Sequence, residues 1–161
     1  MKVEKYLMEV AKAIIARKVG GKLMNPPALW KHPEEKNVGV SIDCGFGILV
    51  YEDLSIFQME NFRILKEDLV DSDWRNYEKF VLTGIKKELP SGALKKKNAT
   101  LAELVSESGR KIWINEKYLK YFDYHADFYQ KCDGSMICIS DATCHGVPVL
   151  TAVVMPVRYS E

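Results

Sequence analysis

Residues 111–159 read KIWINEKYLKYFDYHADFYQKCDGSMICISDATCHGVPVLTAVVMPVRY, and this stretch decides the expected fold. Residues 112–114 are β-prone, and residues 115–122 fit a short helix with Asn115 as its N-cap. The apolar side of this helix carries Tyr118, Leu119 and Phe122. A strand therefore passes directly into a helix.

Three further strands are expected after this helix, over residues 126–131, 135–140 and 147–159. The first two are joined by Cys132-Asp133-Gly134, whose Asp-Gly pair tolerates the positive φ angles of a tight hairpin. The three strands can pair as an antiparallel meander. The order predicts an α+β fold in which helices cover one face of an antiparallel sheet.

Two short motifs in this stretch carry a resemblance to bacterial DNA sliding clamps. Residues 154–158, Val-Met-Pro-Val-Arg, resemble the Val-Met-Pro-Met-Arg ending of those proteins, and residues 114–119 resemble their apolar-Asn-x-x-Tyr-Leu pattern. Both occur at the matching distance, and agreement of two motifs with their spacing is more specific than either motif alone. The resemblance implies a clamp-like domain of two helix-plus-sheet halves. The alternative is an unrelated α+β domain that ends on a hydrophobic strand.

The first 65 residues are expected to form the other half. Residues 2–18 have apolar side chains at helical spacing and should form an amphipathic helix that Gly20-Gly21 ends. Residues 22–37 are rich in proline and charge and indicate a long loop anchored by Trp30. The strand-like runs that follow are residues 38–50, with a bend at 44–47, and residues 54–65, with a turn at 52–53 between the two runs.

The segment between the halves, residues 66–110, is predicted to be a helical insertion. One helical stripe ends at Pro90-Ser91-Gly92, and Thr100 with Glu103 resembles the capping box of a second short helix. The stripe contains Trp74, Tyr77, Val81, Ile85 and Leu89. The chain thus divides into a first half (1–65), the insertion (66–110) and a second half (111–161), within one domain.

Composition limits the functional classes. The 161 residues are 47% hydrophobic and 28% charged, as in an ordinary globular domain, and the net charge is only +1. Any contact with DNA therefore needs a local basic face or an assembly. No apolar run reaches the length of about 20 residues that spans a membrane. We expect a cytoplasmic protein without membrane contact, whose four cysteines, Cys44, Cys132, Cys138 and Cys144, are reduced and form no structural disulfide.

The resemblance also implies the candidate sites. Clamps encircle DNA with six domains and line the hole with basic helix faces, so a homo-oligomer of this chain would contact DNA through Lys5, Lys12, Lys117 and Lys120. Glu116 lies one turn before Lys120 and is placed to pair with it. In bacterial clamps the C-terminal residues help to form a groove for short peptides of polymerases and other replication proteins. The matching residues are Met155, Pro156, Val157 and Arg158, whose plainer interpretation is a final sheet strand.

Catalytic and metal sites are the weaker hypotheses. Cys132, Cys138 and Cys144 are spaced six residues apart, unlike the close pairs of structural zinc sites, and Cys138 lies among apolar strand residues. Cys144 and His145 are adjacent, so on an extended chain their side chains point to opposite sides and make a poor catalytic dyad. We expect no metal, no cofactor and no enzymatic activity.

Three functional classes follow from these observations. The first is a non-enzymatic accessory or adaptor protein of DNA replication, of the kind a mobile element encodes. The second is a protein-interaction module, or a decoy that binds clamp partners, without DNA binding. The third is a small thiol or metal enzyme, which would need an activated Cys138 or Cys144.

Overall fold

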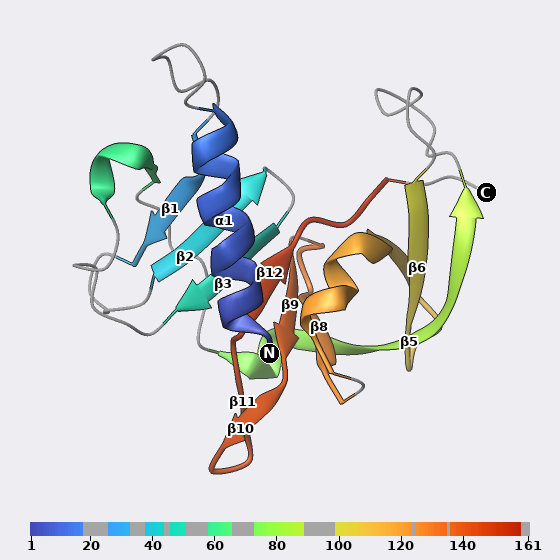
Figure 1. Ribbon diagram of the computed structural model, residues 1–161. Helices are drawn as coiled ribbons and strands as arrows, with labels where there is room; N and C mark the ends of the chain where they lie inside the picture. Colours follow the sequence, from blue (N-terminus) through green and yellow to red (C-terminus); the bar gives the residue numbers. More distant parts are fainter. Residues whose placement is uncertain are drawn as a thin grey trace.

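The computed structural model describes residues 1–17, 26–32, 38–43, 46–50, 58–65, 73–88, 99–123, 125–134 and 136–158. It is a mixed α+β structure, mostly sheet with one main helix, α1 (Val3–Arg17) (Figure 1). This agrees with the expected fold class at that level. The expected end of the first helix at Gly20-Gly21 lies outside the described residues.

Ten of the strands in the described residues form one sheet, in the order β4-β1-β2-β3-β12-β9-β8-β5-β6-β7. Neighbouring strands are antiparallel except β1 and β4, which run parallel. The strands are β1 (Ala28–Lys31), β2 (Val38–Asp43), β3 (Phe46–Val50), β4 (Arg63–Leu65), β5 (Tyr77–Glu88), β6 (Ala99–Ser106), β7 (Lys111–Asn115), β8 (Asp127–Lys131), β9 (Ile137–Ser140) and β12 (Ala152–Val154).

The remaining elements are short. Three 3-10 helices occur among the described residues, η2 (Met59–Asn61), η3 (Trp74–Asn76) and η4 (Glu116–Tyr121). A separate hairpin of β10 (Ala142–Cys144) and β11 (Val147–Val149) projects from the body of the protein (Figure 1). Its turn contains His145 and Gly146, both with positive φ, of 51° and 78°. A two-residue turn of this geometry matches the twist of the strands it joins.

The predicted meander of the second half is confirmed. Strands β8, β9 and β12 are antiparallel neighbours, and Gly134 in the turn between β8 and β9 has a φ of 76°. The helix predicted after β7 is η4, and the Asn115 side chain caps it by accepting a hydrogen bond from the Lys117 N–H at 3.1 Å. The final run, residues 147–159, is not one strand. It is divided between β11 and β12, because Val147 to Val149 pair locally with β10 while Ala152 to Val154 pair with β3 and β9.

The predicted helices in residues 66–110 are wrong where the structure describes that segment. Residues 77–88 are strand β5 and residues 99–106 are strand β6, and the two form an antiparallel hairpin. The stripe through Tyr77, Val81 and Ile85 predicted a helix wrongly, because residues spaced four apart lie on one side of a helix and also on one side of a regular strand. A bulge between Leu82 and Gly84 then shifts the alternation. Figure 1 shows β5 curving strongly along its length, as a bulged strand does.

Two predictions for the first half also need correction. The loop expected over residues 22–37 contains strand β1, which lies between β2 and β4, so its hydrogen-bond partners come from distant parts of the sequence. Trp30 within it is buried, as expected of an anchor. In the described part of the strand expected over residues 54–65, η2 precedes β4 and only β4 is a strand; residues 52–57, with the expected turn at 52–53, lie outside the described residues. The run 38–50 is two strands, β2 and β3.

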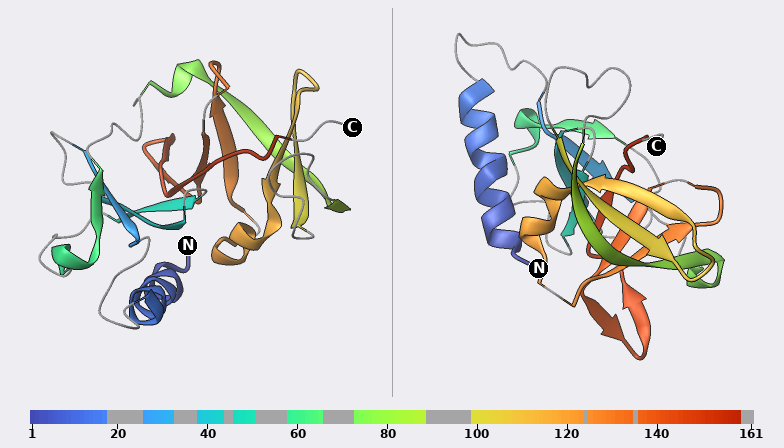
Figure 2. Two further views of the ribbon diagram at one scale, coloured as in Figure 1. Left: turned by 90° about the horizontal axis from the view of Figure 1, so that it is seen from above. Right: turned by 90° about the vertical axis from the view of Figure 1, so that its right-hand side faces the viewer.

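The main core lies between the sheet and the two helices α1 and η4. Its buried residues include Tyr6 and Val10 of α1, Phe46 of β3, and Tyr118 and Tyr121 of η4. Figure 2 shows α1 and η4 on the same side of the sheet. A smaller buried cluster around Trp30, Cys138 and Val153 covers the opposite face. The predicted arrangement of helices on one face is therefore present, and the pairing of β3 with β12 joins both halves in one sheet.

Candidate functional sites on the helix layer and the C-terminal segment

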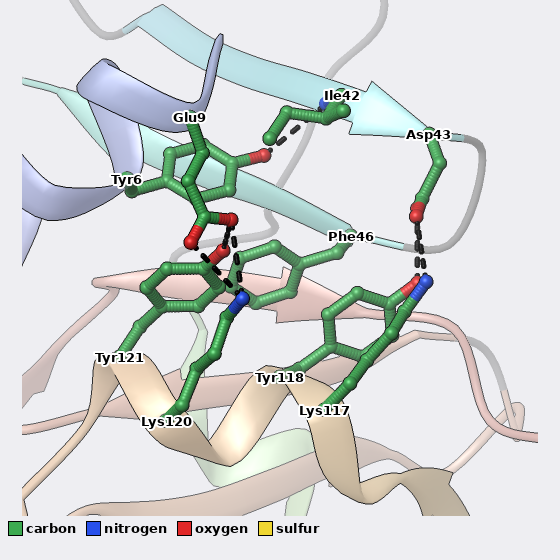
Figure 3. Close-up of a pocket in the computed structure, with 9 residues that line it drawn as sticks. All are labelled: Tyr6, Glu9, Ile42, Asp43, Phe46, Lys117, Tyr118, Lys120 and Tyr121. Atoms are coloured by element: carbon green, nitrogen blue, oxygen red, sulfur yellow. Dashed lines mark hydrogen bonds and ion pairs between the residues drawn. The ribbon is translucent and has the colours of Figure 1, made fainter. Parts of the chain in front are cut away.

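A pocket of about 210 Å³ lies where α1, the β2–β3 hairpin and η4 meet, and it contains two of the four candidate DNA-binding lysines (Figure 3). Lys117 and Lys120 both come from η4. The backbone N–H of Lys2 donates to the Tyr121 carbonyl at 2.9 Å, which brings the start of α1 against the end of η4. The residues that line the pocket are Tyr6, Glu9, Ile42, Asp43, Phe46, Lys117, Tyr118, Lys120 and Tyr121.

One side of this pocket is centred on Asp43. The Lys117 Nζ lies 2.9 Å from the Asp43 Oδ2, and the Tyr118 hydroxyl donates to the Asp43 Oδ1 at 2.9 Å. Figure 3 shows both side chains reaching the same carboxylate from η4. Because β2 carries Asp43 and η4 carries the other two residues, these contacts connect the first half of the chain to the second.

The other side of the pocket is centred on Glu9 of α1. The Lys120 Nζ lies 3.0 Å from the Glu9 Oε1, and the Tyr121 hydroxyl also donates to the Glu9 carboxylate. The hydrogen bond from Tyr121, followed by that from Lys120, lowers the pKa of Glu9 below its ordinary value. Burial, and then the bond to Glu9, raises the pKa of Tyr121. Glu9 is therefore a carboxylate near neutral pH, and Lys120 pairs with it rather than with Glu116, the neighbour considered from sequence.

Aromatic rings fill the space between the two carboxylates. Phe46 stacks on Tyr118 with ring centroids 4.6 Å apart and on Tyr121 with centroids 5.6 Å apart. Tyr6 meets Phe46 edge to face at 5.3 Å. The Tyr6 hydroxyl donates to the Val40 carbonyl at 3.0 Å and accepts from the Ile42 N–H at 3.2 Å. The acids and rings of this pocket hold the two halves together, which gives them a structural role.

The other two candidate lysines, Lys5 and Lys12, are exposed on α1. Lys5 is near enough to Glu9 for its charge to contribute to the lowered pKa of that carboxyl. The structure thus places all four lysines on α1 and η4, the two segments that the sequence predicted to be helices. It also reveals the partners Glu9 and Asp43, which neutralise Lys120 and Lys117 and which no local pattern signals, since they are 111 and 74 residues away in sequence.

The candidate peptide-binding residues follow β12. The Val157 N–H donates to the Trp113 carbonyl at 2.7 Å, forming an antiparallel bridge to β7. Met155 is 45% exposed and Arg158 is also exposed, while Pro156 and Val157 are half-buried. In Figure 1 this segment runs from β12 toward the end of β6. Strand β12 therefore ends at Val154, and residues 155–158 reach β7, the last strand in the order.

The cysteines and histidines do not come together as a site within the described residues. Cys138 is a buried core residue of β9, and burial raises the pKa of its thiol to about 12. Cys132 and Cys144 are exposed in separate turns or hairpins, and His145 occupies the tip of the β10–β11 hairpin. In the part of the chain that is described, no group of three or more His, Cys, Asp or Glu side chains is arranged to hold a metal ion. Cys44 lies outside this part.

No helix in the described ranges is both long enough and apolar enough to cross a lipid bilayer. Comparison of the chain with protein-family models, with curated proteins and with solved structures finds no significant match.

Proposed function

We propose that this protein is a non-enzymatic, clamp-like interaction domain of DNA replication that binds short linear peptides at the segment of Met155, Pro156, Val157 and Arg158. Its expected partners are peptide motifs of replication proteins in the cytoplasm. The proposal rests on the resemblance of residues 154–158 and 114–119 to bacterial clamps, and on one structural observation. That observation is the bridge from Val157 to Trp113, which holds an exposed segment against β7.

The chemistry of the segment suits a peptide. The hydrogen bond from the Val157 N–H to the Trp113 carbonyl, 2.7 Å long, fixes the backbone of the segment. Little conformational entropy therefore remains to be lost when a peptide binds. The exposed Met155 offers a flexible apolar surface. Arg158, also exposed, has a guanidinium that can hold a peptide carboxylate or carbonyl. The segment leaves the sheet at β12, which pairs with β3 and β9 and so fixes where the segment begins.

The test is a titration of a fluorescent clamp-binding peptide against the wild type and against Met155→Ala and Arg158→Ala. We expect each variant to weaken binding by about tenfold, the effect of losing roughly 1.4 kcal/mol of contact energy. Val147→Ala on β11 is the matched control, because Val147 is 50% exposed and lies on the separate hairpin. Absent binding, or equal binding by the wild type and a chain truncated after Val154, would remove this proposal.

A second candidate function is contact with DNA through Lys5, Lys12, Lys117 and Lys120. It is favoured by the placement of all four on α1 and η4, which adjoin each other through the Lys2–Tyr121 backbone hydrogen bond. The ion pairs of Lys117 and Lys120 reduce the charge available to phosphate. We therefore rank this function second and expect weak, strongly salt-dependent binding that needs more than one copy of the chain.

Filter binding with DNA at low and moderate salt concentration tests this second function. The double variant Lys5→Gln with Lys12→Gln removes two exposed charges from α1 and should reduce both the affinity and its dependence on salt. Lys79→Gln is the control, since Lys79 lies on β5 with its ammonium 3.0 Å from Asp127. If the wild type shows no salt-dependent binding at any concentration, the interaction module without DNA binding is the better description.

A further inference from the structure

Strands β5 and β8 separate after a short paired stretch. Strand β5 contains 12 residues, but β8 pairs only with Tyr77 to Phe80. The last pair is Phe80 with Phe128, and beyond it β6 is the only strand partner of residues 81–88 in the described part of the chain. Figure 1 shows this part of β5 extending away from β8. The space between the two strands therefore narrows toward the pair of phenylalanines.

A groove of about 930 Å³ lies in this space, between β5, η4 and the segment that joins η4 to β8. Phe80 and Phe128, at its narrow end, are 1% and 5% exposed. Its volume is in the range of pockets that bind small organic molecules. A strand that ran along this edge of β5 would meet β8 at Phe80. The shape of the groove therefore suits an apolar group that enters end-on.

The apolar walls of the groove are only partly covered by the chain itself. On β5, Val81 is 60% exposed, Leu82 is 40% exposed and Ile85 is 54% exposed. Leu119 and Phe122 line the side opposite β5. Covering such side chains with an aromatic or aliphatic group removes apolar surface from water and is favourable. The walls therefore favour an occupant with an apolar body.

One carboxylate that lines the groove has no cationic partner among the described residues, and it belongs to Glu116. The other charged side chains of the lining form ion pairs: Asp123 with Lys2 at 3.6 Å, Asp127 with Lys79 at 3.0 Å, Lys117 with Asp43 at 2.9 Å and Lys120 with Glu9 at 3.0 Å. His125, which is exposed, also lines the groove. With a neutral histidine, the groove therefore keeps a single negative charge, which is complementary to a cation.

This carboxylate belongs to the wide end of the groove. Glu116 follows Asn115, which pairs with Leu101, and Leu101 pairs with Lys86. This row of the sheet lies beyond Ile85, away from the narrow end. Glu116 is half-buried, so its charge is less screened by water than that of a fully exposed side chain. A carboxylate in the first turn also favours the helix η4, and this role leaves its oxygens able to accept hydrogen bonds from a ligand.

We propose that this groove binds a small organic cation, whose apolar body lies between β5 and η4 and whose ammonium group contacts Glu116. The apolar body covers Leu82 and Ile85, and the ammonium donates charge-assisted hydrogen bonds to the carboxylate. A neutral molecule of the same shape gains the apolar contact but not the ion pair. None of residues 155–158 lines the groove, so this site is separate from the proposed peptide-binding segment.

Three ligands that share one apolar body test the proposal. Phenylbutylamine, phenylbutanol and phenylbutyrate differ in the terminal group, which is cationic, neutral and anionic. Each is titrated against the full chain, and binding is followed by nuclear magnetic resonance of the backbone amides. We expect the amine to bind at least about fivefold more tightly than the alcohol, and the anion to bind most weakly. The signals that shift should include those of residues 81–85 and 116–122.

Two variants separate the charge from the apolar contact. Glu116→Gln should reduce the affinity for the amine to that for the alcohol and leave the affinity for the alcohol unchanged. Glu107→Gln is its control, because Glu107 is exposed in the turn between β6 and β7. Ile85→Ser should weaken binding of all three ligands by about fivefold, whereas Ile64→Ser on β4 should not. Ile85 and Ile64 are each about half exposed, so both variants should keep the fold, which circular dichroism checks.

Several results would overturn the proposal. They are equal binding of the amine and the alcohol by the wild type, no binding of either, an amine preference that survives Glu116→Gln, and affinities that Ile85→Ser leaves unchanged. Sedimentation velocity of the wild type and of Ile85→Ser adds a further check. A dimer that Ile85→Ser abolishes would mean that a second copy of the chain fills the groove, and this also contradicts the proposal.

Discussion

Two regions that border the helix layer differ in how far their side chains are buried. The first, called the joint here, is where α1, η4 and the β2–β3 hairpin meet, and the second is the edge of β5 over residues 81–88 that faces away from β6. At the joint, Phe46 and the tyrosines are buried and both carboxylates, Glu9 and Asp43, have cationic partners. At the edge, Val81 and Ile85 remain more than half exposed, and β6 is the only strand partner of residues 81–88 among the described residues. The difference indicates that the joint stabilises the single chain, whereas the side chains of Val81 and Ile85 bury little of their surface within it.

Removing a ring from the joint should have the largest effect on stability. Phe46 is 2% exposed and stacks on two tyrosines, so Phe46→Ala leaves a cavity and should lower the free energy of unfolding by about 3–5 kcal/mol. Denaturant unfolding monitored by circular dichroism measures this. Ile15→Ala on the exposed face of α1 is the control and should change the value by less than about 0.5 kcal/mol. A loss below about 1 kcal/mol for Phe46→Ala would show that the joint is not a core element.

The next largest effect should come from the Tyr6 hydroxyl, which is buried and both donates and accepts a hydrogen bond. Tyr6→Phe leaves the Val40 carbonyl and the Ile42 N–H without this partner and should cost about 1–3 kcal/mol. Tyr118→Phe is the matched control, because Asp43 keeps its ion pair with Lys117 when the Tyr118 hydroxyl is lost. Equal losses for the two variants in chemical denaturation would contradict this assignment.

The ion pair of Glu9 should contribute less, and its contribution should depend on pH. The pKa of Glu9 is lowered in the folded protein, first by the Tyr121 hydroxyl and then by Lys120. The stabilisation by the Glu9 carboxylate is therefore complete above the pKa of a glutamate in the unfolded chain, about 4.3. It is lost as the pH falls through the lower pKa that Glu9 has in the folded protein. Glu9→Gln should cost about 1 kcal/mol or less near neutral pH.

The same variant should reduce the acid-side decline in stability, which thermal unfolding at a series of pH values measures. Glu4→Gln serves as the comparison, since Glu4 is exposed on the same helix. If Glu9→Gln leaves the acid-side slope unchanged relative to the wild type, the carboxylate is not stabilised by its neighbours.

The smallest effect on the single chain should come from the open edge. Val81→Thr with Ile85→Thr keeps β-branched side chains that favour a strand, and both positions are exposed. The free energy of unfolding should change by less than about 0.5 kcal/mol. A loss of several kcal/mol in denaturant unfolding would mean that these residues belong to the core of the single chain, and the contrast with the joint would fail.

The second half of the chain was largely predictable because its signals are local. An Asn cap, an Asp-Gly turn and alternating apolar runs specify β7, η4, β8 and β9 within a few residues. Strand β5 was not predictable in the same way. The spacing of Tyr77, Val81 and Ile85 fits a helix and a strand equally well, and the pairing with β6 and β8 decides between them. Strand β1, likewise, depends on its neighbours β2 and β4.

The candidate sites also have some features that local sequence patterns predict and others that depend on long-range contacts. The sequence by itself determined that Lys117 and Lys120 share a short capped helix with Tyr118, and that Cys138 belongs to a buried strand, since helix periodicity and strand alternation operate over a few residues. Only the tertiary structure decided that Asp43 and Glu9 neutralise those lysines, that residues 155–158 reach β7, and that β8 pairs with only the first four residues of β5. These features depend on contacts between residues far apart in the chain, and long-range pairing leaves no periodic pattern near either partner.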